Sequence, residues 1–219
     1  MKLFKTLFFF VLITSCSSIE FSRVAPGYVE AFKSLNTLIN GYDDNNLITA
    51  ELVSKIPYAS LVMNIGNGPK GLMILESKSR EITTRVSADN VYIVKMNGKI
   101  VRTAGLTNNL DELLHTVDFS DLLNIDTNQT YIYYASFSEP KLYNLKLNAV
   151  FTKGERKLFN LLNNKIYLTL IEEEVVSEEL GWKILNKYWV DDNSYIWKSS
   201  QTVSPKIPQL QIEVTKKPS

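Results

Sequence analysis

The stretch NVYIVKMNGKIVRT, residues 90–103, carries the clearest structural signal in the chain. Two apolar, β-branched runs flank Asn97-Gly98, and both central residues of a type I′ turn need a positive φ, which Asn and Gly adopt readily. The stretch therefore predicts a tight antiparallel hairpin. Counting away from the turn predicts these cross-strand pairs: Met96 with Lys99, Val94 with Val101, and Tyr92 with Thr103.

Strand signals continue on both sides of this hairpin. Upstream, two apolar runs flank the turn sequence Gly-Asn-Gly-Pro at residues 66–69. Downstream, residues 143–151 alternate cleanly between apolar and polar side chains. Successive strands with short links predict an all-β fold with minor helices, in which an antiparallel meander curls into a half-barrel or a sandwich. Besides the hairpin, the expected strands are Ala59–Ile65, Gly71–Ser77, a run around Ile82 and Arg85, Tyr131–Phe137, Tyr143–Phe151, Lys165–Ile171, Trp182–Val190, Tyr195–Ser199 and Leu210–Val214.

Short helices are expected at three places. Apolar residues between positions 28 and 39 recur at helical spacing, which predicts an amphipathic helix. Thr49 should cap a second short helix that stops before Pro57, because the residue before a proline disfavours the helical conformation. The spacing of Leu110, Leu113 and Leu114 predicts a third. We expect the N-terminal helices to pack against the sheet.

The N-terminus has the composition of an export signal. Two lysines precede the apolar run Leu7–Ile13, which is far shorter than the roughly 20 residues that a membrane-spanning helix needs. The sequence Ile-Thr-Ser-Cys that ends at Cys16 resembles a lipobox, in which small residues precede the cysteine that receives lipid. We therefore expect residues 1–15 to be a lipoprotein signal peptide, residues 16–27 a lipidated tether, and residues 28–219 a single β-rich domain.

A lipid on Cys16 would determine where the protein resides. Each buried CH₂ of an acyl chain contributes about 0.8 kcal/mol, so several chains hold a protein firmly on a membrane. Ser17 follows the cysteine, whereas an aspartate there signals retention in the inner membrane in lipoproteins of this type. We therefore expect the protein on the periplasmic face of the outer membrane. Because Cys16 is the single cysteine, no intramolecular disulfide can form.

Composition and motifs argue against several kinds of chemistry. The chain has 24 basic and 23 acidic residues and no basic patch, so we expect no nucleic-acid partner. His115 is the single histidine, and without cysteine ligands it cannot form an ordinary zinc site, so it is expected to stabilise a helix end. The glutamates at 172–174 are expected in a charged loop or at a strand end. We expect no metal and no cofactor.

The aromatic residues of the C-terminal third raise the question of sugar stacking. Tyr188 and Trp189 are adjacent on an expected strand and must point to opposite faces. Core packing is the interpretation that we favour for most of the set, which comprises Trp182, Tyr188, Trp189, Tyr195 and Trp197. Two interpretations stay open for Asp89 and Arg102: they belong to the base of the hairpin, where a salt bridge could form, or to a partner-binding surface.

Four longer stretches resemble one known family. They are residues 48–75 (ITAELVSKIPYASLVMNIGNGPKGLMIL), 85–110 (RVSADNVYIVKMNGKIVRTAGLTNNL), 186–201 (NKYWVDDNSYIWKSSQ) and 205–218 (PKIPQLQIEVTKKP). In this order and at these spacings they resemble the YjbF family of lipoproteins, also called the group 4 capsule polysaccharide lipoprotein family (YjbF/GfcB). The most specific pieces are the segments IPYAS, VSAD, GKIVRTAGL and YWVD, while residues 115–181 are much less distinctive.

The resemblance implies a non-catalytic role beside polysaccharide export proteins. Members are encoded with capsule or exopolysaccharide operons and are thought to act with an outer-membrane β-barrel protein, a second periplasmic protein and an export channel. We therefore expect an outer-membrane lipoprotein that supports assembly or export of the polysaccharide, with the polysaccharide itself as a further candidate partner. The alternatives are a periplasmic carbohydrate-active enzyme, and a carrier of lipid or lipoprotein with an apolar cup. Motif positions, structural or partner-binding, are Pro57, Tyr58, Ser60, Ser87, Asp89, Arg102, Thr103, Gly105, Tyr188, Trp189 and Asp191.

Overall fold

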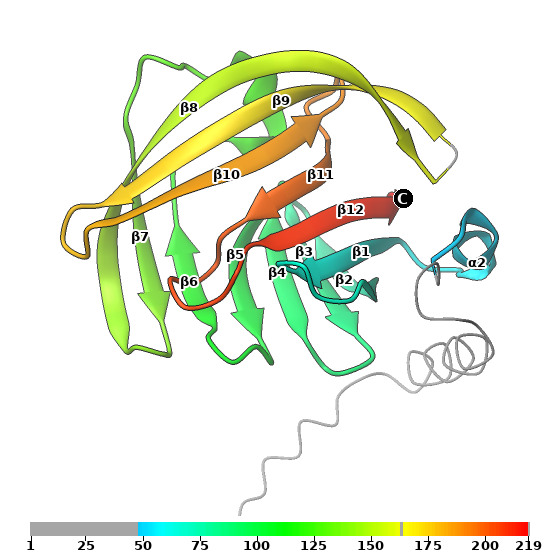
Figure 1. Ribbon diagram of the computed structural model, residues 1–219, viewed down its shortest axis with the longest axis horizontal. Helices are drawn as coiled ribbons and strands as arrows, with labels where there is room; N and C mark the ends of the chain where they lie inside the picture. The colour runs from blue at the N-terminus through cyan, green and yellow to red at the C-terminus, as the bar shows by residue number, and fades with distance from the viewer. Residues whose placement is uncertain (1–47, 163, 219) are drawn as a thin grey trace, which may run out of the picture.

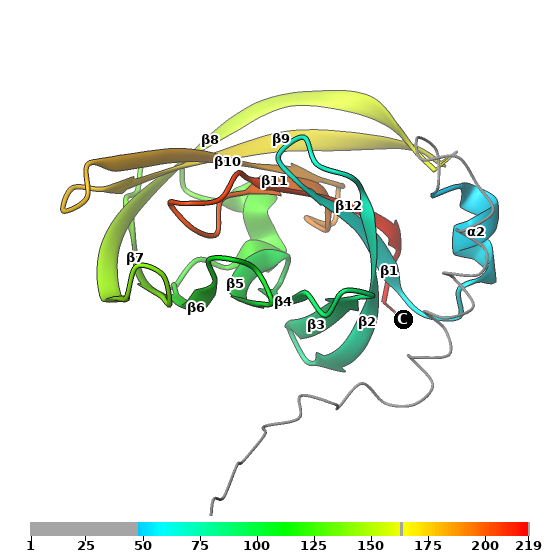
Figure 2. The same ribbon diagram turned by 60° about the horizontal axis from the view of Figure 1, so that its bottom comes forward.

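The computed structural model describes residues 48–162 and 164–218, and within them twelve antiparallel strands form one sheet. The sheet curls into a nearly closed, barrel-like shape (Figures 1 and 2), which confirms the predicted all-β class. The strands are β1 (Ser60–Ile65), β2 (Gly71–Ser79), β3 (Ile82–Ser87), β4 (Tyr92–Met96), β5 (Lys99–Ala104), β6 (Leu110–Leu114), β7 (Tyr131–Phe137), β8 (Leu142–Leu161), β9 (Asn164–Ser177), β10 (Trp182–Val190), β11 (Ile196–Gln201) and β12 (Leu210–Lys216).

The order of the strands brings the two ends of the described chain together. Strands that follow one another in the sequence pair with each other, and β1 pairs with β12, so the order is β5-β4-β3-β2-β1-β12-β11-β10-β9-β8-β7-β6. The two edge strands, β5 and β6, are consecutive in the chain and meet at a seam. Thr103 holds this seam, because its hydroxyl oxygen accepts a hydrogen bond from the Leu110 amide at 2.9 Å.

The hairpin between β4 and β5 forms as expected at its turn but not along its arms. Asn97 and Gly98 have φ angles of 48° and 95°, and Met96 faces Lys99. The predicted pairing of Val94 with Val101 is wrong, because a β-bulge leaves Val101 unpaired and places Val94 opposite Arg102. Because of the bulge, Tyr92 pairs with Ala104 and not, as was predicted, with Thr103.

The helix predicted at Leu110–Leu114 is wrong, because this segment is strand β6. Leu110 pairs with Phe137 and Leu113 pairs with Ala135, and the register shifts between them. The extra residue of this bulge reverses the alternation of side chains, so that Leu110 and Leu113 both face the core. A bulged strand thus imitates the spacing of three residues that is typical of a helix.

The helix predicted at Thr49 is confirmed. Helix α2 (Ala50–Lys55) begins after Thr49, whose side chain accepts a hydrogen bond from the Leu52 amide at 3.2 Å. The chain after α2 packs through Ile56 on the outer face of the sheet, against Ile74 and Val86. The helix predicted between residues 28 and 39 and the lipidation site at Cys16 lie outside the described residues.

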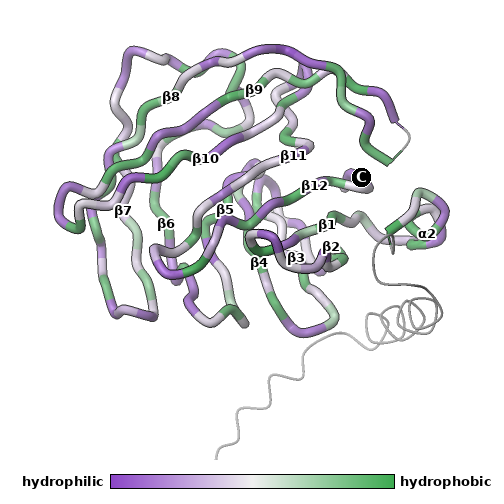
Figure 3. Tube along the Cα trace, viewed as in Figure 1, coloured by the Kyte–Doolittle hydropathy of each residue, from purple (hydrophilic) through white to green (hydrophobic). Residues whose placement is uncertain are grey.

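The interior of the curled sheet forms the main core. Hydropathy alternates along most strands (Figure 3), and the apolar side chains of alternate positions point inward. A 3₁₀ helix, η1 (Phe119–Asn124), which the sequence analysis did not predict, contributes Phe119 and Leu122 to this core. In the part of the chain that the structure describes, no helix combines the length and apolar character required to cross a bilayer.

Candidate functional site

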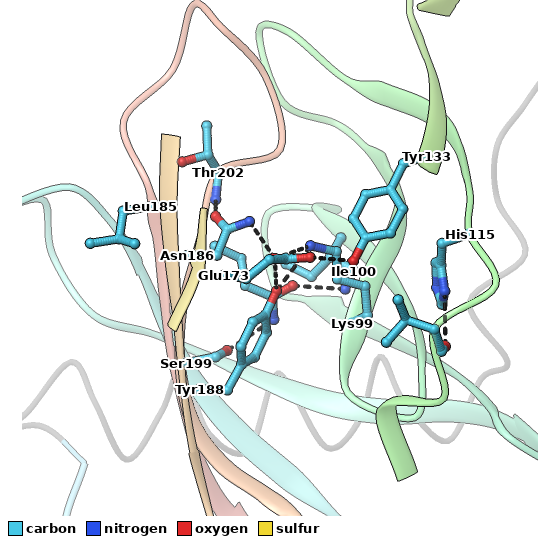
Figure 4. Close-up of polar contacts among 12 residues, drawn as sticks. Lys99, Ile100, His115, Tyr133, Glu173, Leu185, Asn186, Tyr188, Ser199 and Thr202 are labelled. Atoms are coloured by element: carbon cyan, nitrogen blue, oxygen red, sulfur yellow. Dashed lines mark hydrogen bonds and ion pairs between the residues drawn. The ribbon is translucent and has the colours of Figure 1, made fainter. Parts of the chain in front are cut away.

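A buried carboxylate, Glu173, lies inside the curled sheet and is 0% exposed (Figure 4). It belongs to β9, so the prediction that residues 172–174 form a charged loop or a strand end is wrong. Glu172 and Glu174 point to the outer face, where they pair with Lys187 and Lys183 on β10. Alternation along the strand then places Glu173 on the inner face.

Glu173 accepts hydrogen bonds from four side chains that reach it from three other strands. The Lys99 ammonium on β5 lies 2.7 Å from Oε2, and the Tyr188 hydroxyl on β10 donates to the same oxygen at 2.6 Å. Asn186, also on β10, donates to Oε2 at 2.7 Å, and Tyr133 on β7 donates to Oε1 at 2.7 Å. Figure 4 shows these side chains converging on the carboxylate.

The cluster keeps Glu173 ionised despite its burial. Burial raises the pKa of the carboxyl group, but the Lys99 ammonium and the hydroxyl donors outweigh it, so the pKa lies below its usual value. Burial and the nearby carboxylate raise the pKa of both phenols, Tyr133 and Tyr188, which therefore stay protonated and act as donors. The rings of Phe119, Tyr133 and Tyr188 surround the Lys99 ammonium at 5.5–5.6 Å.

The space beside this cluster is too small for a substrate. The adjoining cavity, which Lys99, Tyr133 and Trp182 help to line, has a volume of about 20 Å³. That volume holds about one water molecule, whereas sites for small molecules occupy about 300–1,000 Å³. The described side chains also fill the region where an apolar cup would lie. The Glu173 cluster therefore joins β5, β7, β9 and β10 from inside, and its chemistry is that of a structural network.

His115 lies beside the cluster and not at a helix end as predicted. It follows β6, its Nδ1 contacts the Val117 carbonyl oxygen at 3.1 Å, and its ring packs against Phe119 and Tyr133. Burial and the Lys99 charge lower the pKa of His115 to about 4. The imidazole is therefore neutral at pH 7.

Several motif positions shape turns around the seam. The Ser87 hydroxyl donates to the Asp89 carboxylate and accepts from the Val91 amide at 3.0 Å, which fixes the turn between β3 and β4. Asp89 therefore bonds with Ser87, and the described residues show no ion pair between Asp89 and Arg102, whose side chain is exposed. Gly105 has a φ of 82°, and a Cβ there would lie 2.5 Å from the Asn90 carbonyl oxygen.

Asp191 organises the turn between β10 and β11. Its Oδ1 accepts from the amides of Asn193 and Tyr195, and its Oδ2 accepts from Trp197 Nε1 at 2.9 Å and from Lys217 at 3.1 Å. Burial favours the neutral acid, but these donors keep the pKa of Asp191 below its usual value. Two backbone hydrogen bonds close the turn, from the Asp191 amide to the Tyr195 carbonyl oxygen at 3.1 Å and from the Ser194 amide to the Asp191 carbonyl oxygen at 2.9 Å.

The remaining motif positions are spread over the sheet. Tyr188 is fully buried and belongs to the Glu173 cluster, while Trp189 points outward and contacts Phe159. The Ser60 hydroxyl bonds with that of Thr215 at 2.8 Å, where β1 meets β12. Tyr58 packs on the outer-face cluster, and Pro57 is exposed beside it. The motif positions therefore do not converge on one pocket.

Comparison with known proteins identifies the family of the chain. The family model described as "Group 4 capsule polysaccharide lipoprotein gfcB, YjbF" matches residues 31–215. The chain belongs to the YjbF family. Membership in the YjbF family makes it a lipoprotein of the capsule polysaccharide group.

Two relatives of this YjbF protein come from Escherichia coli K12. One is the uncharacterized lipoprotein GfcB, which is 22% identical over 154 residues, or 68% of this chain and 72% of the relative. The other is the crystal structure of the hypothetical lipoprotein YmcC, with a TM-score of 0.73 and 20% identity over 87% of this chain and 96% of that chain. The YmcC structure shows that the curled sheet is shared.

Proposed function

We propose that this protein is held by a lipid on Cys16 at the periplasmic face of the outer membrane, where it supports assembly or export of a capsule or exopolysaccharide. It acts by contacting partner proteins, an outer-membrane β-barrel protein and polysaccharide export proteins, and not by catalysis. The observation that carries this proposal is the match of the capsule polysaccharide lipoprotein family over residues 31–215.

The geometry of the interior supports the non-catalytic part of the proposal. The fully buried carboxylate of Glu173 accepts hydrogen bonds from four side chains of the protein itself, which are Lys99, Tyr133, Asn186 and Tyr188. A general acid or base must reach the substrate at hydrogen-bond distance. The adjoining volume of about 20 Å³ gives a sugar ring no such access.

A deletion strain tests the role in polysaccharide assembly. We expect removal of the gene to reduce surface polysaccharide, measured by quantitative immunoblot of washed cells, and the wild-type gene to restore it. Cys16→Ala should shift the protein out of the outer-membrane fraction, whereas the matched control Ser17→Ala should leave it there. Mass spectrometry should find lipid on Cys16 and no residues 1–15.

Two results would overturn the proposal. Normal surface polysaccharide in the deletion strain would remove the role in assembly, and a bare Cys16 on the protein recovered from cells would remove the anchor. Cleavage or modification of the strain's own polysaccharide by the purified protein would show instead that it is an enzyme.

Affinity purification from cross-linked envelopes tests the partners. We expect the tagged wild-type protein to retain an outer-membrane β-barrel protein and export proteins, and the Cys16→Ala variant to retain them poorly because it is displaced from the membrane. Equal recovery from the wild type and from a strain that expresses an unrelated tagged lipoprotein would contradict direct contact.

A further inference from the structure

A second cluster of buried charge, separate from Glu173, lies at one end of the curled sheet. Arg85 on β3 is 2% exposed and Lys95 on β4 is 5% exposed, and both line a pocket of about 360 Å³. Lys95 pairs with Thr83, and Arg85 pairs with Ile93. Arg85 and Lys95 are therefore diagonal neighbours on the inner face, with backbones roughly 7 Å apart.

Neither cation has an anionic partner among the residues that the structure describes. Nε and Nη1 of Arg85 are buried and donate no hydrogen bond to any of them, and Lys95 makes no ion pair with them. Burial, together with the neighbouring Arg85 charge, lowers the pKa of Lys95 to about 7. Two adjacent buried cations without a carboxylate contrast with Lys99, whose charge Glu173 neutralises at 2.7 Å.

This arrangement disfavours folding unless an anion completes it. An unpaired charge or donor in the interior is unfavourable, and hydrogen bonds to an ionised group are among the strongest in proteins. A guanidinium group presents donors in a planar fork that matches the two oxygens of a carboxylate. The pocket therefore has the chemistry of an oxyanion site.

The rest of the lining favours a sugar as the carrier of that oxyanion. Phe119 and Tyr195 contribute aromatic rings, while Asn97, Ser120 and Asn193 contribute neutral polar groups that can bond to hydroxyls. The volume lies at the lower end of the range for small-molecule sites, which suits one or two sugar residues. One acidic side chain, Glu81, also lines the pocket, beside the basic residues Lys78, Arg80 and Lys217.

We propose that this pocket binds the carboxylate of an acidic sugar residue through Arg85 and Lys95. The proposal deepens the role in polysaccharide assembly and rests on it for the source of the ligand. It assigns the protein a direct contact with the polysaccharide in addition to its protein partners. Phe119 also contacts Tyr188 of the Glu173 cluster, with ring centroids 5.5 Å apart, so one lining residue of the pocket packs against that cluster.

Binding by the mature lipidated protein, purified from envelopes in detergent, tests the proposal without any substitution. The probes for titration calorimetry are a glucuronate trisaccharide, its methyl ester, a neutral glucose trisaccharide and inorganic phosphate. We expect the acidic trisaccharide to bind at least tenfold more tightly than the other three. Equal binding of the methyl ester or of the glucose trisaccharide would overturn the carboxylate assignment, and equal binding of phosphate would overturn the assignment to a sugar.

Substitutions then locate the site. Arg85→Met and Lys95→Met should each weaken binding of the acidic trisaccharide at least tenfold, whereas Lys146→Met, on the exposed face of β8, should not change it. Without ligand, both pocket variants should melt at or above the wild-type temperature, because each loses an unpaired buried cation. Unchanged affinity in both variants, or a lower melting temperature with unchanged affinity, would overturn the proposal in favour of a structural role.

Failure of this proposal can be told apart from failure of the proposed function. In a deletion strain that has lost surface polysaccharide, full recovery with the Arg85→Met protein would overturn the sugar site and leave the role in assembly intact. A deletion strain with normal polysaccharide would overturn the role in assembly, whatever the calorimetry of the purified protein.

Discussion

Lys99 and Glu173 form an ion pair of 2.7 Å inside the sheet, although 74 residues separate them in the sequence. Lys99 belongs to edge strand β5, and Glu173 belongs to β9, which lies near the opposite end of the strand order. The pair therefore spans the interior and links the edge at the seam to the opposite wall. Both side chains are buried, with exposures of 5% and 0%.

Removing one member of this pair should destabilise the protein strongly. Glu173→Gln leaves a buried ammonium without its counter-ion, and Lys99→Met leaves a buried carboxylate with fewer donors. We expect each variant to lose about 3–5 kcal/mol of unfolding free energy, and the double variant to lose less than the sum. Urea unfolding followed by tryptophan fluorescence measures all three.

The neighbouring pair Glu172 and Lys187 is the matched control. It joins the same strand, β9, to its neighbour β10 at 3.0 Å, but it lies on the outer face and is partly exposed to solvent. Glu172→Gln should therefore change stability by at most about 1 kcal/mol. Equal effects of Glu172→Gln and Glu173→Gln would refute the claim that burial determines the importance of Glu173.

The Tyr188 hydroxyl should contribute through its hydrogen bond to the Glu173 carboxylate. Tyr188→Phe retains the ring contact with Phe119 but removes a donor that lies 2.6 Å from Oε2. Hydrogen bonds to charged groups contribute about 1.5–3 kcal/mol, so we expect a loss of that size in thermal or urea unfolding. Tyr143→Phe, at a tyrosine that is 71% exposed, should have no effect, and a similar loss there would contradict this interpretation.

Gly105→Ala should test how tightly the chain after β5 packs against the turn between β3 and β4. Its φ of 82° is unfavourable for alanine, and the new Cβ would lie 2.5 Å from the Asn90 carbonyl oxygen. Gly181 has a φ of 59° but nothing within 4 Å of its Cβ position. Gly181→Ala should therefore lose only the backbone contribution of about 1–2 kcal/mol, and Gly105→Ala should lose clearly more. Equal melting temperatures for the two variants would show that the turn at Asn90 moves aside without loss of stability.

His115 should make the fold sensitive to mild acid. Its pKa in the folded protein is about 4, below the ordinary value of 6.5, so the unfolded chain takes up a proton first as the pH falls. Its contribution to stability should therefore be complete above pH 6.5 and decline toward pH 4. His115→Phe should reduce the slope of unfolding free energy against pH in this window. Parallel slopes for wild type and variant would contradict the assignment.

The sequence was a good guide to the strands because their signals are local. Asn97-Gly98 specifies its turn by the φ values that the two residues accept, and the alternation along residues 143–151 continues into the longer strand β8. The predictions were wrong at Val101 and in β6, because each strand contains a β-bulge. One extra residue reverses the alternation of side chains, and no residue type in the sequence indicates where it lies.

The buried charges could not be predicted in the same way. Glu173 sits within a run of three glutamates that has the composition of a solvated segment, and its counter-ion lies on a distant strand. The expected strand Lys165–Ile171 ends before Glu173, whereas β9 continues to Ser177. If the strand had been predicted at its full length, the alternation of its side chains would have placed Glu173 on the inner face. Arg85 was assigned to a strand, but its burial depends on η1 and β11, whose residues help line the same pocket.

The pairing of β1 with β12 has a consequence for folding. Ser60 and its partner Lys216 lie near opposite ends of the described chain, so one side of β1 keeps unpaired backbone donors and acceptors until β12 is in place. Pairing between distant parts of a chain is slow, and an unpaired strand edge is prone to aggregation in the meantime. Proteolytic cleavage that releases Leu210–Lys216 would leave β1 and β11 each with an unpaired edge.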